Sequence, residues 1–520
     1  MEIRTKEKYG MKILPMTLMR FLCVCLIIFG FFSCNKKQPA NKVDWSELFK
    51  EYSAPKDSLK LQALNFLKAN MADLTSEKIV YFDRNSGVPV ELDFSDFQSD
   101  SLFKQYLEEN NIDHKSVYIK DREIISNDYL KKRIENAFSV WKKYPWNSEV
   151  SFDNFLDYLL PYKVMDEYPD DWTSTLHTKF SSDISKYSNA YNTGPDSVKK
   201  LYRQANELYY AFNVNRIGEY FNYSAQPAYL SNRAGFNEIA LLKDGDCYGG
   251  AYLGVYYLRS IGIPATVDYV QYWGSKNGSH ATEVFINELG KMTTASGRGL
   301  SGAAKVFRLS FRQKNLWKDS IAPFVEPENF TLKNLKNNHW SDVTEFHTTV
   351  KDINLSIKDG LKYIHKYGYI CVFNYGEWLP IFWAKANENR TYTFKKMGYP
   401  MLYRTAVPIG DSFKLIGPTY MIDSLGQIKV NKPENTFVNI VCQKINTGEE
   451  SWVRKGKQYD LFVLDELSGW NRRSTSMCLK DSLLSFENVP KKAIYRLIPR
   501  GDLRELSRPF TYEKNRQVWW

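Results

Sequence analysis

Cysteine and histidine are scarce in this sequence, whose 520 residues include seven cysteines and six histidines. They form no CxxC or HExxH motif and no cluster with metal-ligand spacing, so we predict neither a structural nor a catalytic metal. Four cysteines are spread widely beyond residue 40: Cys247, Cys371, Cys442 and Cys478. This spacing excludes a disulfide framework, although one pair such as Cys442 with Cys478 stays open.

A glycine-rich phosphate loop and a concentrated basic tract are also missing. The formal net charge is +11, and it falls to about +8 when residues 1–33 are set aside. Basic doublets such as Lys131-Lys132 are scattered and are typical of solvated faces rather than of a nucleic-acid track. We therefore predict no nucleotide cofactor, no other cofactor and no nucleic-acid partner.

Long hydrophobic runs are rare, and the clearest one, Phe21–Phe32, is too short to span a bilayer comfortably. Lys12 and Arg20 precede this run, and Ser33-Cys34 ends it. This pattern resembles a bacterial lipoprotein signal, which implies cleavage of residues 1–33 and attachment of an acyl lipid such as palmitate to Cys34. An ordinary cleaved signal is the alternative. We expect the mature chain in the cell envelope, anchored to a membrane, with the periplasmic side favoured because Asn35-Lys-Lys-Gln lacks acidic residues.

Aromatic residues are plentiful, at 15% of the chain, and 43% of the residues are hydrophobic. This composition is typical of folded β-rich cores, with carbohydrate or peptide contact surfaces as the alternative. A chain of this length predicts two or three domains.

The order of patterns along the chain predicts a multidomain α+β protein. Helical spacing of apolar residues over Ser58–Met71, Asp128–Lys142 and Phe152–Tyr162 predicts a helical lobe over residues 34–175. Residues 176–320 form a central α+β core, which a long helix over 195–221 enters. Residues 335–520 change to short alternating runs, which predict one large β-sandwich or two small ones with a boundary near residue 433. The runs are Asn354–Ile357, Tyr369–Phe373, Leu379–Trp383, Arg390–Phe394, Thr436–Val441 and Gln458–Val463.

The centre of the chain combines a cysteine at a helix start with a histidine on a strand. Asp246 can cap a helix that begins at Cys247, and Gly262 and Pro264 end it. Ala265–Val270 and His280–Ile286 alternate like strands. A thiol in the first helical turn lies at the positive end of the helix dipole, which favours the thiolate.

A cysteine and a histidine can act together because imidazole accepts the thiol proton and later returns it to a leaving amine. Backbone N–H groups near the helix start can stabilise the oxyanion that forms. We take Cys247 and His280 as the candidate catalytic pair, and Tyr248, Tyr272 and Trp273 as candidate substrate-binding residues. A buried structural cysteine is the alternative interpretation.

These motifs resemble the transglutaminase-like, papain-like core. The resemblance rests on Gly-Asp-Cys247, the apolar helix, Arg259-Ser-Ile-Gly-Ile-Pro-Ala265 and His280-Ala-x-Glu-Val-Phe. It implies a papain-like α+β core with Cys247 as nucleophile and His280 as base. Further stretches are similar to the large transglutaminase-domain lipoproteins of Bacteroides-type bacteria: Phe152–Tyr162, Lys305–Arg308, Ser341–Thr344, Arg508–Tyr512 and Trp519-Trp520.

The third catalytic member departs from the family pattern. The family usually places an aspartate on the strand after the histidine, whereas Lys291–Ser296 contains no acid. Thr294 is the third candidate, with Thr293 and Asn287 as alternatives. Loss of the acid removes orientation and imidazolium stabilisation.

Two functions follow from the sequence. The first is a thiol hydrolase or acyltransferase that acts on an amide of a peptide, cell-wall peptide or glycopeptide through a thioester. The second is a non-catalytic glycan- or peptide-binding scaffold with a degenerate core. Two other histidines, His339 and His347, are expected to have structural roles.

Overall fold

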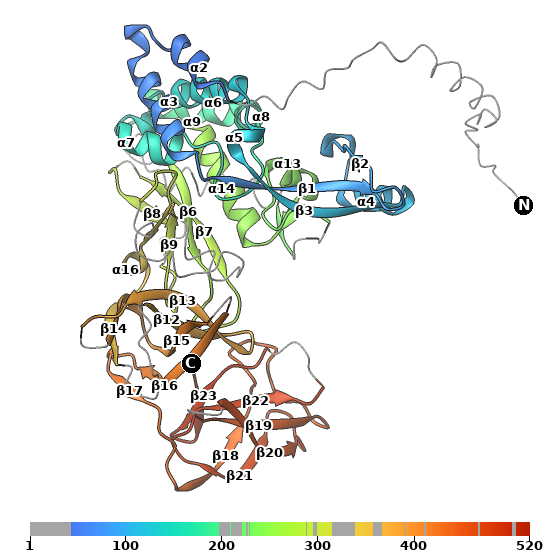
Figure 1. Ribbon diagram of the computed structural model, residues 1–520, viewed down its shortest axis with the longest axis vertical. Helices are drawn as coiled ribbons and strands as arrows, with labels where there is room; N and C mark the ends of the chain where they lie inside the picture. The colour runs from blue at the N-terminus through green and yellow to red at the C-terminus, as the bar shows by residue number, and fades with distance from the viewer. Residues whose placement is uncertain are drawn as a thin grey trace, which may run out of the picture.

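The computed structural model describes residues 43–196, 209, 221–224, 227, 229–287, 289–294, 299–314, 338–356, 367–388, 391–409, 412–465, 469–501 and 506–520. Within these residues the chain combines helices with several antiparallel sheets (Figure 1), which confirms the α+β class. The predicted signal, Cys34 and most of the helix predicted over 195–221 lie outside the described residues.

The N-terminal helices pack around one apolar core. They are α2 (Trp45–Glu51), α3 (Ser58–Asn70), α6 (Asn127–Val140) and α7 (Phe152–Asn154), which continues into a π-helical turn at Phe155–Leu159. Asp44 caps α2, and Ser126 caps α6 by accepting a hydrogen bond from Tyr129 N. Leu64, Leu67, Leu130, Ile134 and Phe155 are buried in the shared core. The helices predicted from periodicity in this region are confirmed.

A three-stranded antiparallel sheet interrupts the helical lobe. Its strands are β1 (Thr75–Asp83), β2 (Pro89–Val90) and β3 (Ile112–Lys120), and α4 (Asp100–Glu109) packs near its far end. The register runs from Thr75 opposite Lys120 to Asp83 opposite Ile112. Figure 1 shows this arm projecting to one side of the helices. The helical lobe predicted over 34–175 therefore describes only part of that segment, because this strand pairing joins residues far apart in sequence.

The central core places helix α14 (Cys247–Ser260) against a five-stranded sheet of order β10-β9-β6-β7-β8. The strands are β6 (Ala265–Val270), β7 (His280–Ile286), β8 (Met292–Thr294), β9 (Phe307–Leu309) and β10 (Trp340–Asp342). The two strands predicted beside Cys247 agree with β6 and β7 at both ends. Val255 and Leu258 of α14 are fully buried in one cluster with Val267 and Phe285 of the sheet.

Two antiparallel β units follow the core. The first joins the sheet β13-β12-β15-β16-β17 to the pair β11-β14. The second joins the sheet β20-β19-β22-β23-β24 to the pair β18-β21. The first unit contains β11 (Val350–Ser356), β12 (Tyr367–Asn374), β13 (Glu377–Lys385), β14 (Thr391–Gly398), β15 (Met401–Ile409), β16 (Ser412–Ile422) and β17 (Ile428–Val430). The second contains β18 (Phe437–Cys442), β19 (Gln458–Asp465), β20 (Gly469–Met477), β21 (Leu484–Pro490), β22 (Tyr495–Pro499), β23 (Phe510–Glu513) and β24 (Arg516–Trp519). Each unit has its own hydrophobic cluster.

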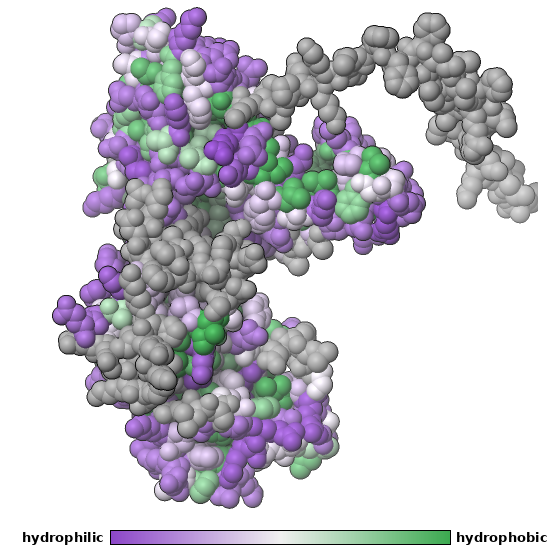
Figure 2. All heavy atoms as spheres, in the orientation of Figure 1, coloured by the Kyte–Doolittle hydropathy of each residue, from purple (hydrophilic) through white to green (hydrophobic). Residues whose placement is uncertain are grey.

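The face of the molecule in Figure 2 is mostly hydrophilic, with apolar side chains scattered over the described residues. None of the helices in the described part of the chain is long and apolar enough to cross a membrane.

Candidate functional site

Cys247 is the first residue of α14, as the sequence predicted. Asp246 is its N-cap, and its Oδ1 accepts hydrogen bonds from Tyr248 N at 2.9 Å and Gly249 N at 3.1 Å. The Cys247 side chain is half-buried against the core that α14 shares with the sheet. The capping carboxylate thus fixes the helix start and occupies two of its free N–H donors.

The sulfur of Cys247 lies beside strand β7. The backbone N–H of Ala281, the residue after His280, lies close enough to the sulfur to lower its pKa. The pKa of the thiol is nevertheless raised, chiefly by burial and also by the Asp246 carboxylate, against the lowering effects of the Ala281 N–H and Arg233. The expectation of a stabilised thiolate is therefore wrong. Desolvation of the thiolate has a larger effect on the pKa than the N–H groups at the start of the helix, and the capping carboxylate of Asp246 adds a negative charge nearby.

His280 begins β7, and its side chain belongs to the face of the sheet away from α14. It lies directly opposite Val270 of β6, and opposed residues of an antiparallel pair share a face. Val270 is buried in a cluster with Trp273, Ala303 and Val306, whereas Ala281 packs with α14. The His280 ring lies 5.8 Å from the Trp273 ring, centroid to centroid.

The thiol and the imidazole are not joined by a hydrogen bond. The described residues show no hydrogen bond between Cys247 and His280, and none from any side chain to the His280 ring. Burial, together with the positive charge of Lys276, lowers the pKa of His280. Both groups are therefore predominantly neutral at neutral pH.

The structure does not bring Thr294 to the imidazole. Thr294 of β8 lies opposite Val284, four residues along β7 from His280 and thus about 13 Å away at the rise of a strand. The Asn287 side chain accepts hydrogen bonds from Leu289 N and Lys291 N, both at 3.0 Å, and so stabilises the β7–β8 turn. The orienting role proposed for these residues has no contact that supports it.

Two of the three candidate substrate-binding residues are buried. Tyr248 is 3% exposed and packs beneath the guanidinium of Arg233, which lies 3.7 Å from its ring centroid. Trp273 is 4% exposed, with Lys276 Nζ at 4.1 Å from its ring. Tyr272 is half-buried against the core of the first β unit. Tyr248 and Trp273 thus pack behind the site and are not exposed on its surface.

The loop that carries His280 is held by a residue that sequence reasoning missed. Asn374, fully buried at the end of β12, donates from Nδ2 to Trp273 O and Gly278 O, each at 3.0 Å, and to Lys276 O at 3.2 Å. Its Oδ1 accepts from Gly278 N at 3.0 Å. One amide side chain of the first β unit therefore fixes both ends of the loop 273–278.

The second β unit contributes a further contact to the same loop. Arg508 is 2% exposed and donates to Gly274 O, Phe373 O and Trp520 O, and at 3.3 Å to Asn277 Oδ1. Asn277 in turn donates to Leu506 O at 3.0 Å. The motif Arg508-Pro-Phe was noted in the sequence, but only the fold shows that it contacts this loop.

Both histidines expected to be structural are buried and bonded. His347 Nε2 lies 2.6 Å from Asp268 Oδ2, and Arg308 makes two hydrogen bonds to the same carboxylate, each 2.7 Å. His339 Nδ1 lies 2.9 Å from Phe311 O. Asp268 is directly opposite Thr282, on the face that carries His280, but its carboxylate already binds Arg308 and His347.

Comparison with protein-family models and with curated proteins finds no match to this sequence. Among the described residues, no group of three or more His, Cys, Asp or Glu is arranged to hold a metal ion. The chemistry open to this arrangement is set by the groups that it contains. These are a neutral thiol at a helix start, the backbone N–H of Ala281 near its sulfur, and the neutral imidazole of His280, the residue before Ala281.

Proposed function

We propose that this chain is a lipid-anchored envelope protein in which Cys247 takes an acyl group from an amide of a peptide, cell-wall peptide or glycopeptide. One observation carries the proposal: the sulfur at the start of α14 lies close enough to the backbone N–H of Ala281, the residue after His280, for that N–H to lower its pKa. This agrees with the resemblance of Gly-Asp-Cys247 and His280-Ala to the transglutaminase-like core. Such a site forms a thioester that is hydrolysed or passed to another acceptor.

The reaction begins from a neutral thiol and a neutral imidazole. His280 accepts the thiol proton as the sulfur attacks the amide carbon, and the imidazolium returns the proton to the amine as the C–N bond breaks. Water or an amine then attacks the thioester and releases the thiol. The His280 side chain lies on the face of β7 away from α14, so the first step requires the start of β7 to reorient until the imidazole reaches the sulfur. Hydrogen bonds of this kind often tighten only with substrate bound.

The second candidate function is a non-catalytic envelope scaffold that binds glycan or peptide. Two observations favour it: the His280 ring packs against Trp273 without a hydrogen bond to the sulfur, and burial raises the pKa of Cys247. In this case the Cys247 region is a structural relic, and the β units hold the ligand.

Acyl capture distinguishes the two functions. The mature chain is incubated with p-nitrophenyl acetate, and the labelled residue and the turnover rate are measured by mass spectrometry and nitrophenol release. We expect acylation at Cys247, none in Cys247→Ala, and a rate lowered about 100-fold or more in His280→Ala, because a positioned base contributes that much. The buried Cys371, Cys442 and Cys478 are internal controls that stay unlabelled.

An equal acylation rate in His280→Ala and wild type would refute general-base catalysis at this site. The scaffold function is then tested with isolated cell-wall muropeptides. If wild type and Cys247→Ala bind the same muropeptide equally well and neither turns it over, the scaffold function is established and the enzymatic function is excluded.

A further inference from the structure

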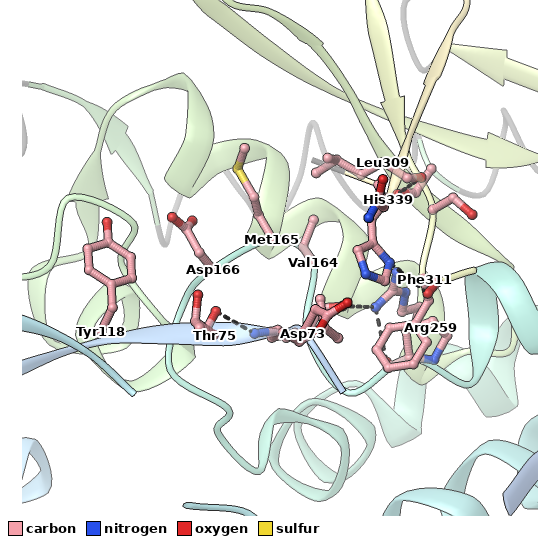
Figure 3. Close-up of a pocket in the computed structure, with 16 residues that line it drawn as sticks. Asp73, Thr75, Tyr118, Val164, Met165, Asp166, Arg259, Leu309, Phe311 and His339 are labelled. Carbon is pink, nitrogen blue, oxygen red and sulfur yellow. Dashed lines mark hydrogen bonds between the residues drawn. The ribbon is translucent and has the colours of Figure 1, made fainter. Parts of the chain in front are cut away.

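A cavity lies at the opposite end of α14 from Cys247. It has a volume of about 280 Å³, the size of a site for a small molecule. Arg259, which lines it, is twelve residues after Cys247, so about 18 Å of helix separates the cavity from the thiol. Figure 3 shows Tyr118 and Asp166 toward one end of the cavity and His339, Phe311 and Arg259 toward the other. This cavity is separate from the site proposed above.

The positive charges around the cavity are already bonded. Lys163 Nζ lies 2.6 Å from Asp121 Oδ2 and donates to Thr75 O at 2.9 Å. Every nitrogen of the Arg259 guanidinium donates to backbone carbonyls, those of Tyr158, Pro161, Lys163 and Ala265. These groups therefore offer little to an anionic ligand.

Two oxygen acceptors in the lining have no partner. Asp166 Oδ1 and Asn338 Oδ1 are buried and accept no hydrogen bond within the described residues. Asp166 also makes no ion pair within 4 Å there, although Arg233 and Lys163 lie near enough to act on its charge. A buried acceptor without a partner is costly, and a donor group of a ligand removes that cost.

The remaining lining is largely apolar. The apolar side chains that line the cavity together with these two oxygens are those of Leu74, Val164, Met165, Leu309 and Phe311. The cavity thus combines an aliphatic and aromatic wall with one carboxylate and one amide oxygen as free acceptors. The complementary ligand is a small molecule with an aliphatic body and hydrogen-bond donors at its ends, one of them positively charged.

We propose that this cavity binds a small primary amine with an aliphatic body, its ammonium group bonded to Asp166 and a second donor group bonded to Asn338. The size and the two acceptors suit a short diamine or amino alcohol. The proposal concerns a separate site and does not depend on the chemistry at Cys247.

Binding of an amine requires the Asp166 carboxylate in its charged form. Burial raises the pKa of Asp166 to about 6; the charges of Glu167 and Glu77 also raise it, and those of Arg233 and Lys163 lower it. At one pH unit below that pKa about a tenth of the carboxyl groups are ionised. Amine affinity is therefore expected to be about tenfold lower at pH 5 than at pH 7.5.

The test is calorimetric titration of the mature chain with 1,5-diaminopentane, n-pentylamine and 1-pentanol. We expect both amines to bind at millimolar concentration and pentanol to bind at least about tenfold more weakly, since it carries no charge for Asp166. Asp166→Asn should lower amine affinity about tenfold or more. Asn338→Ala should weaken the diamine and leave n-pentylamine unchanged, because only the diamine has a second donor.

Asp73→Asn is the matched control. Asp73 also lines the cavity but is exposed, so solvent screens its charge and amine affinity should stay within about twofold of wild type. The Asp166 side chain makes no hydrogen bond with any described residue, and denaturant unfolding of Asp166→Asn checks that the fold of the variant is intact. Equal binding of pentanol and pentylamine, unchanged amine affinity in Asp166→Asn, or no binding of either amine overturns the proposal.

Discussion

Burial affects the pKa of the Cys247 thiol more strongly than does the position of this thiol at the start of a helix. The first turn of α14 offers N–H groups, but Asp246 occupies two of them and adds its own negative charge. The Ala281 N–H and Arg233 lower the pKa of the thiol without reversing the effect of desolvation. The sulfur consequently needs a base at the moment of attack, which is the role that we propose for His280.

Alkylation kinetics test this description of the sulfur. The rate of Cys247 labelling by iodoacetamide should be lower at pH 7 than that of a free cysteine, because only the thiolate reacts. It should rise about tenfold for each pH unit up to pH 9, since the pKa lies above the ordinary value of 9.0. Labelling is followed by intact-protein mass spectrometry.

Asp246→Asn is the informative variant for this measurement. Asparagine still caps a helix, so α14 is expected to persist, whereas removal of the carboxylate lowers the pKa of the thiol and speeds labelling at pH 7. A labelling rate that levels off below pH 8 in wild type would contradict the raised pKa.

The loop between β6 and β7 is the element on which the site depends. It presents His280, and its backbone is fixed from outside by Asn374 rather than by its own residues alone. A loop tied at both ends by one buried side chain has few ways to rearrange. Asn374 therefore acts as a positioning residue for the imidazole.

Asn374→Ala should disrupt this element. The change leaves the carbonyls of Trp273, Lys276 and Gly278 without their buried donor, at a cost of about 2–4 kcal/mol in the free energy of unfolding. Acylation at Cys247 should slow while the acyl donor concentration for half-maximal rate changes little, because the base is displaced and no substrate contact is removed. The free energy of unfolding and the acylation kinetics are measured on the purified variant.

Asn387→Ala provides the comparison. Asn387 makes similar side-chain bonds, to Thr391, in an exposed turn of the same β unit, and it should leave both quantities nearly unchanged. Asn374→Ala with normal acylation and normal stability would show that the loop holds its shape without this contact.

Local signals in the sequence account for the parts of this site that could be predicted. The cap at Asp246, the helix from Cys247 and both ends of β6 and β7 follow from residues adjacent in the chain. The strand Thr75–Asp83 was missed because its partner begins beyond residue 110. The contacts of Asn374 and Arg508 could not be predicted, since they join the loop to residues 96 and 234 positions away.

At the scale of the molecule, the two β units meet the central core at the same loop. Ile494, Leu464 and Trp470 of the second unit pack into the cluster that also contains Tyr252 of α14 and Phe373 of the first unit. Arg508 adds hydrogen bonds to the loop, to β12 and to the C-terminal strand region. The β units therefore support the candidate site as well as forming separate cores.

Arg508→Ala should uncouple the second β unit from the rest. That unit has its own buried cluster, including Ile440, Leu461 and Phe510, so it should stay folded while the loop 273–278 loses its donor. Hydrogen exchange should speed up in this loop, and thermal unfolding should separate into resolved transitions, as expected when an interdomain contact is lost.

Arg500→Ala is the matched control, because Arg500 lies in the same unit but is about half exposed, with a side-chain exposure of 49%. It should leave exchange in the loop unchanged. Identical exchange in wild type and Arg508→Ala would show that apolar packing alone holds the units together.

The Arg508 contact also bears on the order of events during folding. Its partner Gly274 lies 234 residues earlier in the chain, and contacts of such long separation form late because a large loop must close first. A newly made chain can therefore form α14 and its sheet early while the loop that carries His280 is not yet fixed. The candidate site would form in two stages. In a chain whose last β unit misfolds, Cys247 would be in place at the start of α14, but the loop that carries His280 would not be fixed.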